Sequence, residues 1–133
     1  MTSSARDGDP ITIVVADDHT VMRNGLRMLL EAEDDFRVVA EAGTVQAVFV
    51  NVRGHRPAVL VLDLNMPGGS SIAAISRLST ISPHTAVVVL TMEHDPAFMR
   101  EALAAGASGY VLKDAAATDL VRAIRSAVGA GWR

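Results

Sequence analysis

Residues 11–18 read ITIVVADD, a strongly apolar run that ends on two acidic residues. Three further runs share this pattern and end on a carboxylate, a hydroxyl and an ammonium respectively: AVLVLD (58–63), AVVVLT (86–91) and YVLK (110–113). Short apolar runs bounded by turn residues are typical of buried parallel strands. Because the carboxyl ends of parallel strands meet at one edge of a sheet, where ligands bind, we expect these polar residues to converge at one site.

Segments with helical spacing separate these runs. Apolar residues recur at intervals of three and four, and each set predicts one buried helix face: Val21, Met22, Gly25, Leu26, Leu29 and Leu30; Val45, Val48, Phe49 and Val52; Ile72 and Ile75; Met99, Ala102 and Leu103; and Leu120, Val121, Ile124, Ala127 and Val128. A mixed run at 36–42 predicts an additional strand. Strand and helix therefore alternate five times, which predicts an α/β fold: a flavodoxin-like, doubly wound (βα)5 sandwich with a five-stranded parallel sheet in the order 2-1-3-4-5.

Hydroxyl and glycine residues mark the ends of the predicted helices. Four hydroxyl positions are suited to cap helix N-termini: Thr20, Thr44, Ser70 or Ser71, and Thr118. Asp95-Pro96 is predicted to start the fourth helix, since proline is tolerated in a first helical turn. Three glycines stand where helices should stop: Gly54, Gly106 and Gly129.

Length and composition favour one ordinary folded domain. The chain has 133 residues, no cysteine and a net charge of −3. Disulfides and thiolate metal sites are thereby excluded, and the charge gives no general attraction to nucleic acid. The lack of cysteine fits a reducing compartment, and we expect a cytoplasmic protein with no membrane segment. We expect residues 1–10 to form a disordered tail, 11–130 to fold as one domain and 131–133 to be its C-terminal end.

The acidic strand ends predict a metal site. In the order 2-1-3-4-5 the first and third strands are neighbours, so Asp17, Asp18 and Asp63 should lie close together. Two carboxylates 4 Å apart repel by about 4 kcal/mol at an effective dielectric of 20. Either some of them are protonated or a cation is present. Because the cluster offers oxygen ligands, Mg²⁺ is the cofactor that we expect.

The same edge can support phosphoryl transfer. A carboxylate held beside Mg²⁺ can act as a nucleophile toward phosphorus, which would make Asp63 the acceptor of an aspartyl-phosphate. Phosphoryl transfer also needs charge neutralisation at the equatorial oxygens. Lys113 can supply a compact positive charge, and Thr91 can donate a hydrogen bond to a phosphoryl oxygen.

Two other classes of protein use a similar fold. A haloacid-dehalogenase-type phosphatase needs a second aspartate two residues after its nucleophile, but here that position is Asn65, which cannot transfer a proton. A flavodoxin-like electron carrier needs a phosphate-cradling loop after its first strand, where Asp17 and Asp18 would repel a phosphate. Both alternatives rank below the phosphoacceptor.

Four motifs resemble a response-regulator receiver domain: VVADDH (14–19), LVLDLNMPG (60–68), VVVLTM (87–92) and AGASGYVLKD (105–114). Together they cover most of the chain, and the ADDH, NMPG and GASGYVLKD stretches are most similar to the NarL/FixJ subfamily of transcriptional regulators. The resemblance implies that Asp63 accepts a phosphoryl group from the phosphohistidine of a sensor histidine kinase.

The resemblance also implies a role for the other residues of the motifs. Asp18 would bind Mg²⁺ directly, Asp17 would help to position it, and the backbone carbonyl of Asn65 would be a further ligand. Lys113 would bind the phosphoryl group. Thr91 and Tyr110 would form a switch pair, in which the hydroxyl moves toward the phosphoryl group and the ring turns inward.

Several further expectations follow from the resemblance. Asn65 and Glu93 stand at positions that influence the attacking water, so we expect them to modulate hydrolysis of the aspartyl-phosphate. Receivers usually carry glycine near position 71, where this chain has Ser71, so the loop after Asp63 is expected to differ in shape. The domain would not be an enzyme toward other substrates and would catalyse only its own phosphorylation and dephosphorylation.

The implied partners are a sensor histidine kinase and, on phosphorylation, a second copy of the domain. DNA would be bound only through a C-terminal helix-turn-helix domain that this chain does not contain, and we expect residues 131–133 to begin the linker to it. A stand-alone receiver and a dimerisation module that works without phosphorylation remain as alternatives.

Overall fold

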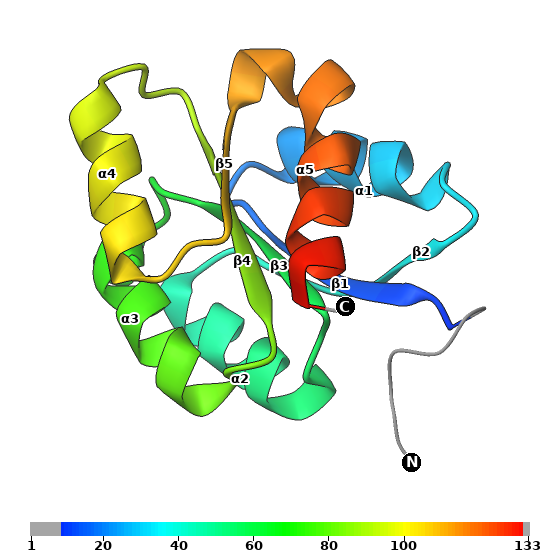
Figure 1. The fold of residues 1–133 in the computed structure, drawn as a ribbon, viewed down its shortest axis with the longest axis horizontal. Coiled ribbons are helices and arrows are strands. Elements are labelled where there is room, and N and C mark those ends of the chain that lie inside the picture. The colour runs from blue at the N-terminus through cyan, green and yellow to red at the C-terminus, as the bar shows by residue number, and fades with distance from the viewer. Residues whose placement is uncertain (1–8, 132–133) are drawn as a thin grey trace.

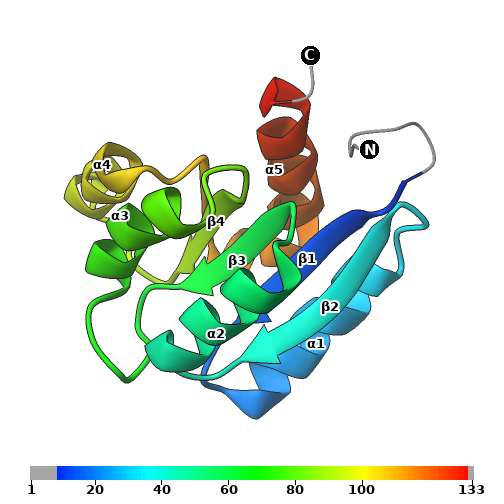
Figure 2. The same ribbon diagram turned by 90° about the horizontal axis from the view of Figure 1, so that it is seen from below.

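A five-stranded parallel sheet in the order β2-β1-β3-β4-β5 organises the computed structural model, which describes residues 9–131 (Figures 1 and 2). The predicted fold class and strand order are confirmed. The strands are β1 (Ile11–Ala16), β2 (Phe36–Ala42), β3 (Val59–Asp63), β4 (Ala86–Thr91) and β5 (Gly109–Leu112). The helices are α1 (Thr20–Glu31), α2 (Val45–His55), α3 (Ser71–Ile81), α4 (Pro96–Ala105) and α5 (Ala116–Gly131), with a short 3-10 helix η1 (Lys113–Ala115) before the last.

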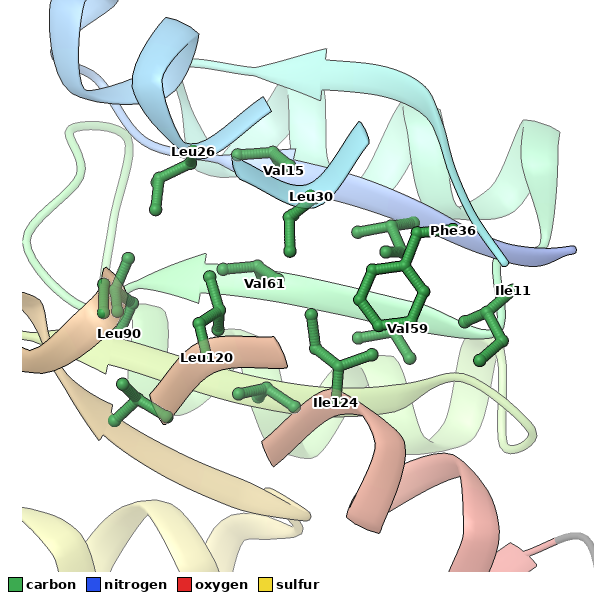
Figure 3. Close-up of a cluster of buried hydrophobic side chains, with 14 of the residues drawn as sticks. Ile11, Val15, Leu26, Leu30, Phe36, Val59, Val61, Leu90, Leu120 and Ile124 are labelled. Carbon is green, nitrogen blue, oxygen red and sulfur yellow. The ribbon is translucent and has the colours of Figure 1, made fainter. Parts of the chain in front are cut away.

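Each face of the sheet carries its own apolar core. Leu26 and Leu30 of α1 and Leu120 and Ile124 of α5 pack on one face, above β1 and β3 (Figure 3). Helices α2, α3 and α4 cover the other face (Figure 1). The side chain of Leu30 is fully buried, and burial of one leucine contributes about 1.5–3 kcal/mol to stability. Layers on both faces explain why the central strands β3 and β4 are apolar almost along their whole length, whereas the edge strand β2 is mixed.

Strand β2 departs from regular pairing with β1. Ile13 pairs with Val38, but the next residue, Val14, pairs with Ala40, so Val39 is an extra residue in the edge strand. An extra residue of this kind is a β-bulge, and it changes which face the following side chains point to. The sequence pattern of residues 36–42 did not predict this bulge.

Some predicted helix ends are confirmed. The hydroxyls of Thr44 and Ser70 accept hydrogen bonds from the backbone N–H groups three residues later, at 3.1 and 3.2 Å. Asp95 caps α4 by accepting from Ala97 at 2.9 Å. Gly106 ends α4 with a φ of +121°, a backbone conformation that glycine adopts without strain.

Other predicted helix ends were wrong. Thr20 is the first residue of α1, and the cap position is His19, whose side chain makes no capping hydrogen bond. Thr118 lies inside α5, where its hydroxyl donates to the carbonyl of Ala115 at 3.1 Å. Gly54 lies inside α2, which ends at His55; Arg56 closes the helix in a left-handed conformation, with a φ of +47°, and its N–H donates to the carbonyl of Val52. Gly129 also lies inside α5.

Two predicted helix faces were too wide. Val21 is 86% exposed, since the buried stripe of α1 is centred on Leu26 and Leu30. On α4 only Ala102 is buried, while Met99 and Leu103 remain 40% and 44% exposed. The faces predicted for α2 and α5 are confirmed.

The predicted tail and linker lie largely outside the described residues. Of residues 1–10, the structure describes only Asp9 and Pro10, which are exposed and belong to neither helix nor strand. Residues 132–133 are not described. Within 9–131, none of the helices combines the length and the apolar character needed to cross a bilayer.

Candidate acidic site at the carboxyl edge of the sheet

Three aspartates meet where β1 and β3 end. Asp17 follows β1 directly and is fully buried, and Asp63 is the last residue of β3 and is 1% exposed. Asp18 lies beside them with its side chain 29% exposed. Carboxylate oxygens of all three lie within 4.8 Å of one another, and a ring nitrogen of His19 joins the group. The adjacency of β1 and β3 therefore produces the acidic cluster that the sequence predicted.

Lys113 reaches this cluster from the end of β5. Its ammonium lies 3.2 Å from Oδ2 of Asp63 and 3.3 Å from Oδ2 of Asp17. The side chain is 9% exposed, so the ion pairs are shielded from water. Lys113 thus contacts two residues that lie 50 and 96 positions before it in the chain.

The carboxylates compete for too few partners. Oδ2 of Asp17 and Oδ2 of Asp63 are buried and accept no well-directed hydrogen bond. Burial raises the pKa of the Asp63 carboxyl above its ordinary value and the charge on Asp17 adds to this, while the N–H of Asn65 and the Lys113 ammonium oppose the shift. Burial lowers the pKa of Lys113, but Asp63 and Asp17 raise it more, and the net shift is upward. The lysine is therefore cationic, and negative charge remains in excess.

This excess fits a divalent cation. Buried oxygen atoms without hydrogen bonds are what a hard cation such as Mg²⁺ would bind. Asp17, Asp18 and Asp63 supply carboxylate oxygens for it. The backbone of Asn65 lies next to them, because its N–H donates to Oδ1 of Asp63 at 3.0 Å. The side chain of His19 is 72% exposed. Its backbone N–H donates to Oδ1 of Asp17 at 2.8 Å, and this hydrogen bond within a turn orders the loop.

Thr91 and Tyr110 are connected through the backbone of Glu93. Thr91 ends β4, is fully buried, and accepts a hydrogen bond from the N–H of Glu93 at 3.0 Å. The hydroxyl of Tyr110 donates to the carbonyl of Glu93 at 3.1 Å. Burial raises the pKa of the Tyr110 hydroxyl, and the acidic side chains of Glu93 and Asp95 add to the shift. The two predicted switch residues thus hold the same peptide segment from either side.

A cavity of about 330 Å³ lies next to this segment. Asn65, Thr91 and Glu93 contribute to its wall, and the exposed side chain of Met92 lies at it. The predicted hydrolysis-modulating pair, Asn65 and Glu93, therefore borders one common space. The remaining lining residues come from the segment after Asp63 and from α4: Leu64, Ser70, Ser71, Ile72 and Phe98.

Two residues beside the site were missed by sequence reasoning. The buried hydroxyl of Ser71 donates to the carbonyl of Asp63 at 3.1 Å, which ties the start of α3 to the end of β3. Its departure from the usual glycine was the signal, although the expected consequence was only a change in loop shape. Nη1 of Arg23 donates to the carbonyl of Asp17 at 2.7 Å. Its position one turn into α1, just after two acidic residues, was the signal for this contact.

Comparison with known proteins identifies the family. The model of the response regulator receiver domain matches residues 13–125, which is most of the chain. The chain belongs to this family. Among curated proteins it is similar to the oxygen regulatory protein NreC of Staphylococcus epidermidis, with 42% identity over 115 residues, which is 86% of this chain and 53% of NreC. The chain thus spans about half the length of the curated relatives that it matches.

Solved structures agree with this assignment. The receiver domain of the response regulator NarL from Mycobacterium tuberculosis superposes with a TM-score of 0.86 at 30% identity, over 91% of this chain and 98% of that one. The isolated receiver domain of RcsB from Salmonella enterica serovar Typhimurium superposes with a TM-score of 0.80 at 33% identity, over 86% and 85%. A LuxR-family regulator from Aurantimonas sp. SI85-9A1 superposes with a TM-score of 0.87 at 33% identity, over 92% and 87%. These relatives confirm the resemblance to the NarL/FixJ subfamily.

Proposed function

We propose that this receiver domain is a phosphorylation-dependent switch in which Asp63 is the phosphoacceptor. The observation that carries the proposal is the buried Oδ2 of Asp63, which accepts no hydrogen bond and lies 3.2 Å from the Lys113 ammonium. A carboxylate oxygen in this state has a free lone pair and a cation beside it. Both are what a nucleophile toward an anionic phosphoryl group requires.

In the proposed reaction, a carboxylate oxygen of Asp63 attacks the phosphorus of a kinase phosphohistidine. The new O–P bond forms as the P–N bond breaks, and the histidine leaves with the electron pair and takes up a proton. Lys113 neutralises charge on the transferred group, and Thr91 can donate its hydroxyl hydrogen to a phosphoryl oxygen. Mg²⁺ bound by Asp17, Asp18, Asp63 and the carbonyl of Asn65 would supply further charge neutralisation.

The switch would follow from the contacts of Glu93. The hydroxyl of Thr91 accepts from Glu93 N–H, and Tyr110 donates to the carbonyl of the same residue. In one of two conformations, the Thr91 hydroxyl would lie close enough to Asp63 to bond to the phosphoryl group. Phosphorylation would therefore shift the population toward that conformation. The Glu93 peptide then transmits the change to Tyr110 and to the start of α4.

Incubation with Mg²⁺ and acetyl phosphate, followed by intact mass measurement, tests the phosphoacceptor. We expect the wild-type protein to gain one phosphoryl group and Asp63→Asn to gain none. Equal labelling of that variant would refute the role of Asp63. If the wild-type protein gains no phosphoryl group and its mass is the same before and after treatment, the result would instead favour a dimerisation module that works without phosphorylation.

Hydrolysis is proposed to depend on the residues at the neighbouring cavity. Asn65 and Glu93 both line it together with Thr91, and we propose that each acts on the water that attacks the aspartyl-phosphate. We expect the half-life of the phosphorylated protein to change in Asn65→Ala and Glu93→Ala. Time courses that superpose on that of the wild type would remove this part of the proposal. Because Asn65 replaces the acid/base aspartate of a haloacid-dehalogenase-type phosphatase, turnover of other phosphate esters is not expected.

The partners are proposed from the relatives. RcsB has been solved in complex with DNA, and its isolated receiver in the presence of the phosphomimetic BeF3−. By analogy, we propose a sensor histidine kinase as phosphodonor, a homodimer as the phosphorylated form, and control of transcription through a C-terminal DNA-binding domain outside this chain. Size measurement with and without phosphorylation tests the dimer.

A further inference from the structure

We propose that Arg23 is a positioning residue for the acidic loop between β1 and α1, and that Glu41 holds its guanidinium in place. The inference rests on the proposed metal site and concerns residues that the receiver motifs do not include. In this proposal, the salt bridge between Arg23 and Glu41 of the edge strand β2 holds the loop so that its carboxylate oxygens stay in position to bind the metal.

The guanidinium makes two directed contacts at once. Nη1 donates to the backbone carbonyl of Asp17 at 2.7 Å, and Nε donates to Oε1 of Glu41 at 2.8 Å. Side chains on a helix lean toward its N-terminus, which allows Arg23 to reach back over the start of α1. A planar guanidinium with several fixed N–H groups can bridge two acceptors, whereas an ammonium cannot match both with the same geometry.

Asp17 depends on this contact for its orientation. Its backbone N–H donates to the carbonyl of Ala42 at 2.9 Å, and its backbone carbonyl accepts from Arg23. Both backbone groups of the buried aspartate are therefore fixed by the end of β2, directly or through Glu41. The Asp17 side chain, which faces Lys113 and Asp63, is thus aimed by contacts on the opposite side of the loop.

The bulge in β2 is what brings Glu41 to Arg23. Before the bulge, Val38 packs on the α1 and α5 face of the sheet; after it, Ala40 and Ala42 pack on the opposite face. Regular alternation from Val38 would have placed Ala40 and Ala42 on the α1 side and Glu41 on the α2 side. The extra residue Val39 reverses this, and bulges beside functional sites often re-aim a side chain in this way.

The surroundings of the pair support a specific role. Arg23 and Glu41 are only 21% and 23% exposed, so their contact is more than a surface ion pair. The next residue but one, Gly43, leaves room for the guanidinium, since a Cβ there would lie 3.3 Å from Nη1 of Arg23.

Arg27 provides a matched control. Its Nη1 lies 2.9 Å from Oε2 of the same Glu41 and its Nε lies 3.3 Å from Glu31, but its side chain is half exposed. Arg23→Ala and Arg27→Ala therefore remove the same charge from the same carboxylate, and of the two only Arg23 bonds to the Asp17 carbonyl.

Titration of MgCl2 into the metal-free protein by calorimetry tests the proposal without any phosphorylation. We expect Arg23→Ala to weaken Mg²⁺ binding about tenfold, as loss of a residue that orients a metal ligand commonly does. Arg23→Lys should also bind more weakly than wild type, and Arg27→Ala should not. Charge alone predicts the opposite sign, because removal of a nearby cation should strengthen Mg²⁺ binding.

The outcomes separate the two proposals. If the wild type binds Mg²⁺ and Arg23→Ala binds it equally or more tightly, the positioning role is overturned while the metal site stands. If the wild type binds no Mg²⁺, the metal site itself is refuted, and the inference with it. Circular dichroism establishes that each variant is folded; should Arg23→Ala not fold, Arg23→Lys decides, and wild-type affinity in that variant overturns the role.

Discussion

Two clusters in this domain combine carboxylates with one cation, and they behave in opposite ways. At the carboxyl edge of the sheet, Asp63 and Asp17 face Lys113 in a site shielded from water. On the surface, Arg125 of α5 lies 2.7 Å from Asp35 and 2.9 Å from Glu33 and stacks over a phenylalanine ring. The pKa of Asp63 is raised, above all by burial, while that of Asp35 is lowered, above all by its hydrogen bond to Arg125.

The difference shows how strongly burial changes the pKa of a carboxylate in an ion pair. The Arg125 cluster is 35–47% exposed, and its carboxylates are well paired. At the acidic site, buried oxygens are left without hydrogen bonds, which costs free energy in the unliganded state. Such a cost is consistent with the proposed binding of a cation and a phosphoryl group at this site.

The largest expected effect is that of removing the buried cation. Lys113→Ala removes the ammonium that the buried carboxylates of Asp17 and Asp63 face. We therefore expect the free energy of unfolding at pH 7 to fall by about 3 kcal/mol. Urea denaturation in metal-free buffer measures it. A loss as small as that from Arg125→Ala would show that the acidic site is well hydrated and would break the comparison.

The next effect is stabilisation by the metal. At a concentration about 100 times its dissociation constant, Mg²⁺ should stabilise the folded state by about 2.7 kcal/mol. Thermal denaturation with Mg²⁺ and with EDTA measures the shift. Asp18→Asn, which changes an exposed ligand and leaves the buried pair intact, should reduce the gain; an undiminished gain would exclude Asp18 as a ligand.

Replacing the proposed phosphoacceptor should stabilise the metal-free protein. Asp63→Asn removes a carboxylate whose ionised form the fold destabilises, and we expect the free energy of unfolding at pH 7 to rise. Because the pKa of Asp63 is higher in the folded state than in the unfolded state, ionisation costs stability in full above the folded pKa and nothing below the unfolded one. The gain should therefore vanish as the pH is lowered through that window, as denaturation at neutral and acidic pH can establish. Destabilisation by this variant at neutral pH would contradict the raised pKa.

The smallest effect is expected at the surface cluster. Arg125→Ala should destabilise the domain by only about 0–1 kcal/mol, and less in high salt, because exposed ion pairs are screened. The pKa of Asp35 is lowered in the folded state, so its contribution is present above the unfolded pKa and is lost as the pH falls through the folded pKa. The difference between wild type and variant should thus shrink under acidic conditions. If the difference in the free energy of unfolding between wild type and variant grew under acidic conditions, the downward direction assigned to the Asp35 pKa would be wrong.

Most of the fold and of the site could be predicted because the signals are local. Four of the five strands end on or next to a polar candidate residue in the sequence itself, as β3 and β4 do with Asp63 and Thr91, and parallel pairing brings these ends together. Helix ends were less predictable. Helix α2 ends with Arg56 in a left-handed conformation, although the nearby Gly54 is the residue type more often found at such a position.

The contacts that hold the site residues in place could not be predicted, because they depend on strand register and on three-dimensional placement. Glu41 stands in a run whose alternation gives the wrong face until the bulge at Val39 is known. The contact of Arg23 with the Asp17 carbonyl is likewise a property of three-dimensional placement. Ser71 was noticed as unusual, but only the structure shows that it bonds to the carbonyl of Asp63.

The order in which the site residues occur along the chain has a consequence for folding. Asp17 comes from the first strand, Asp63 from the third, and Lys113 follows the fifth. Contacts between residues so distant in sequence form late, after the loops between them have closed. During synthesis the N-terminal strands are available first, and the ammonium that completes the site arrives last. A nascent chain therefore lacks the full set of Asp17, Asp63 and Lys113 until β5 has been made and docked, so the proposed site is complete only when the sheet is.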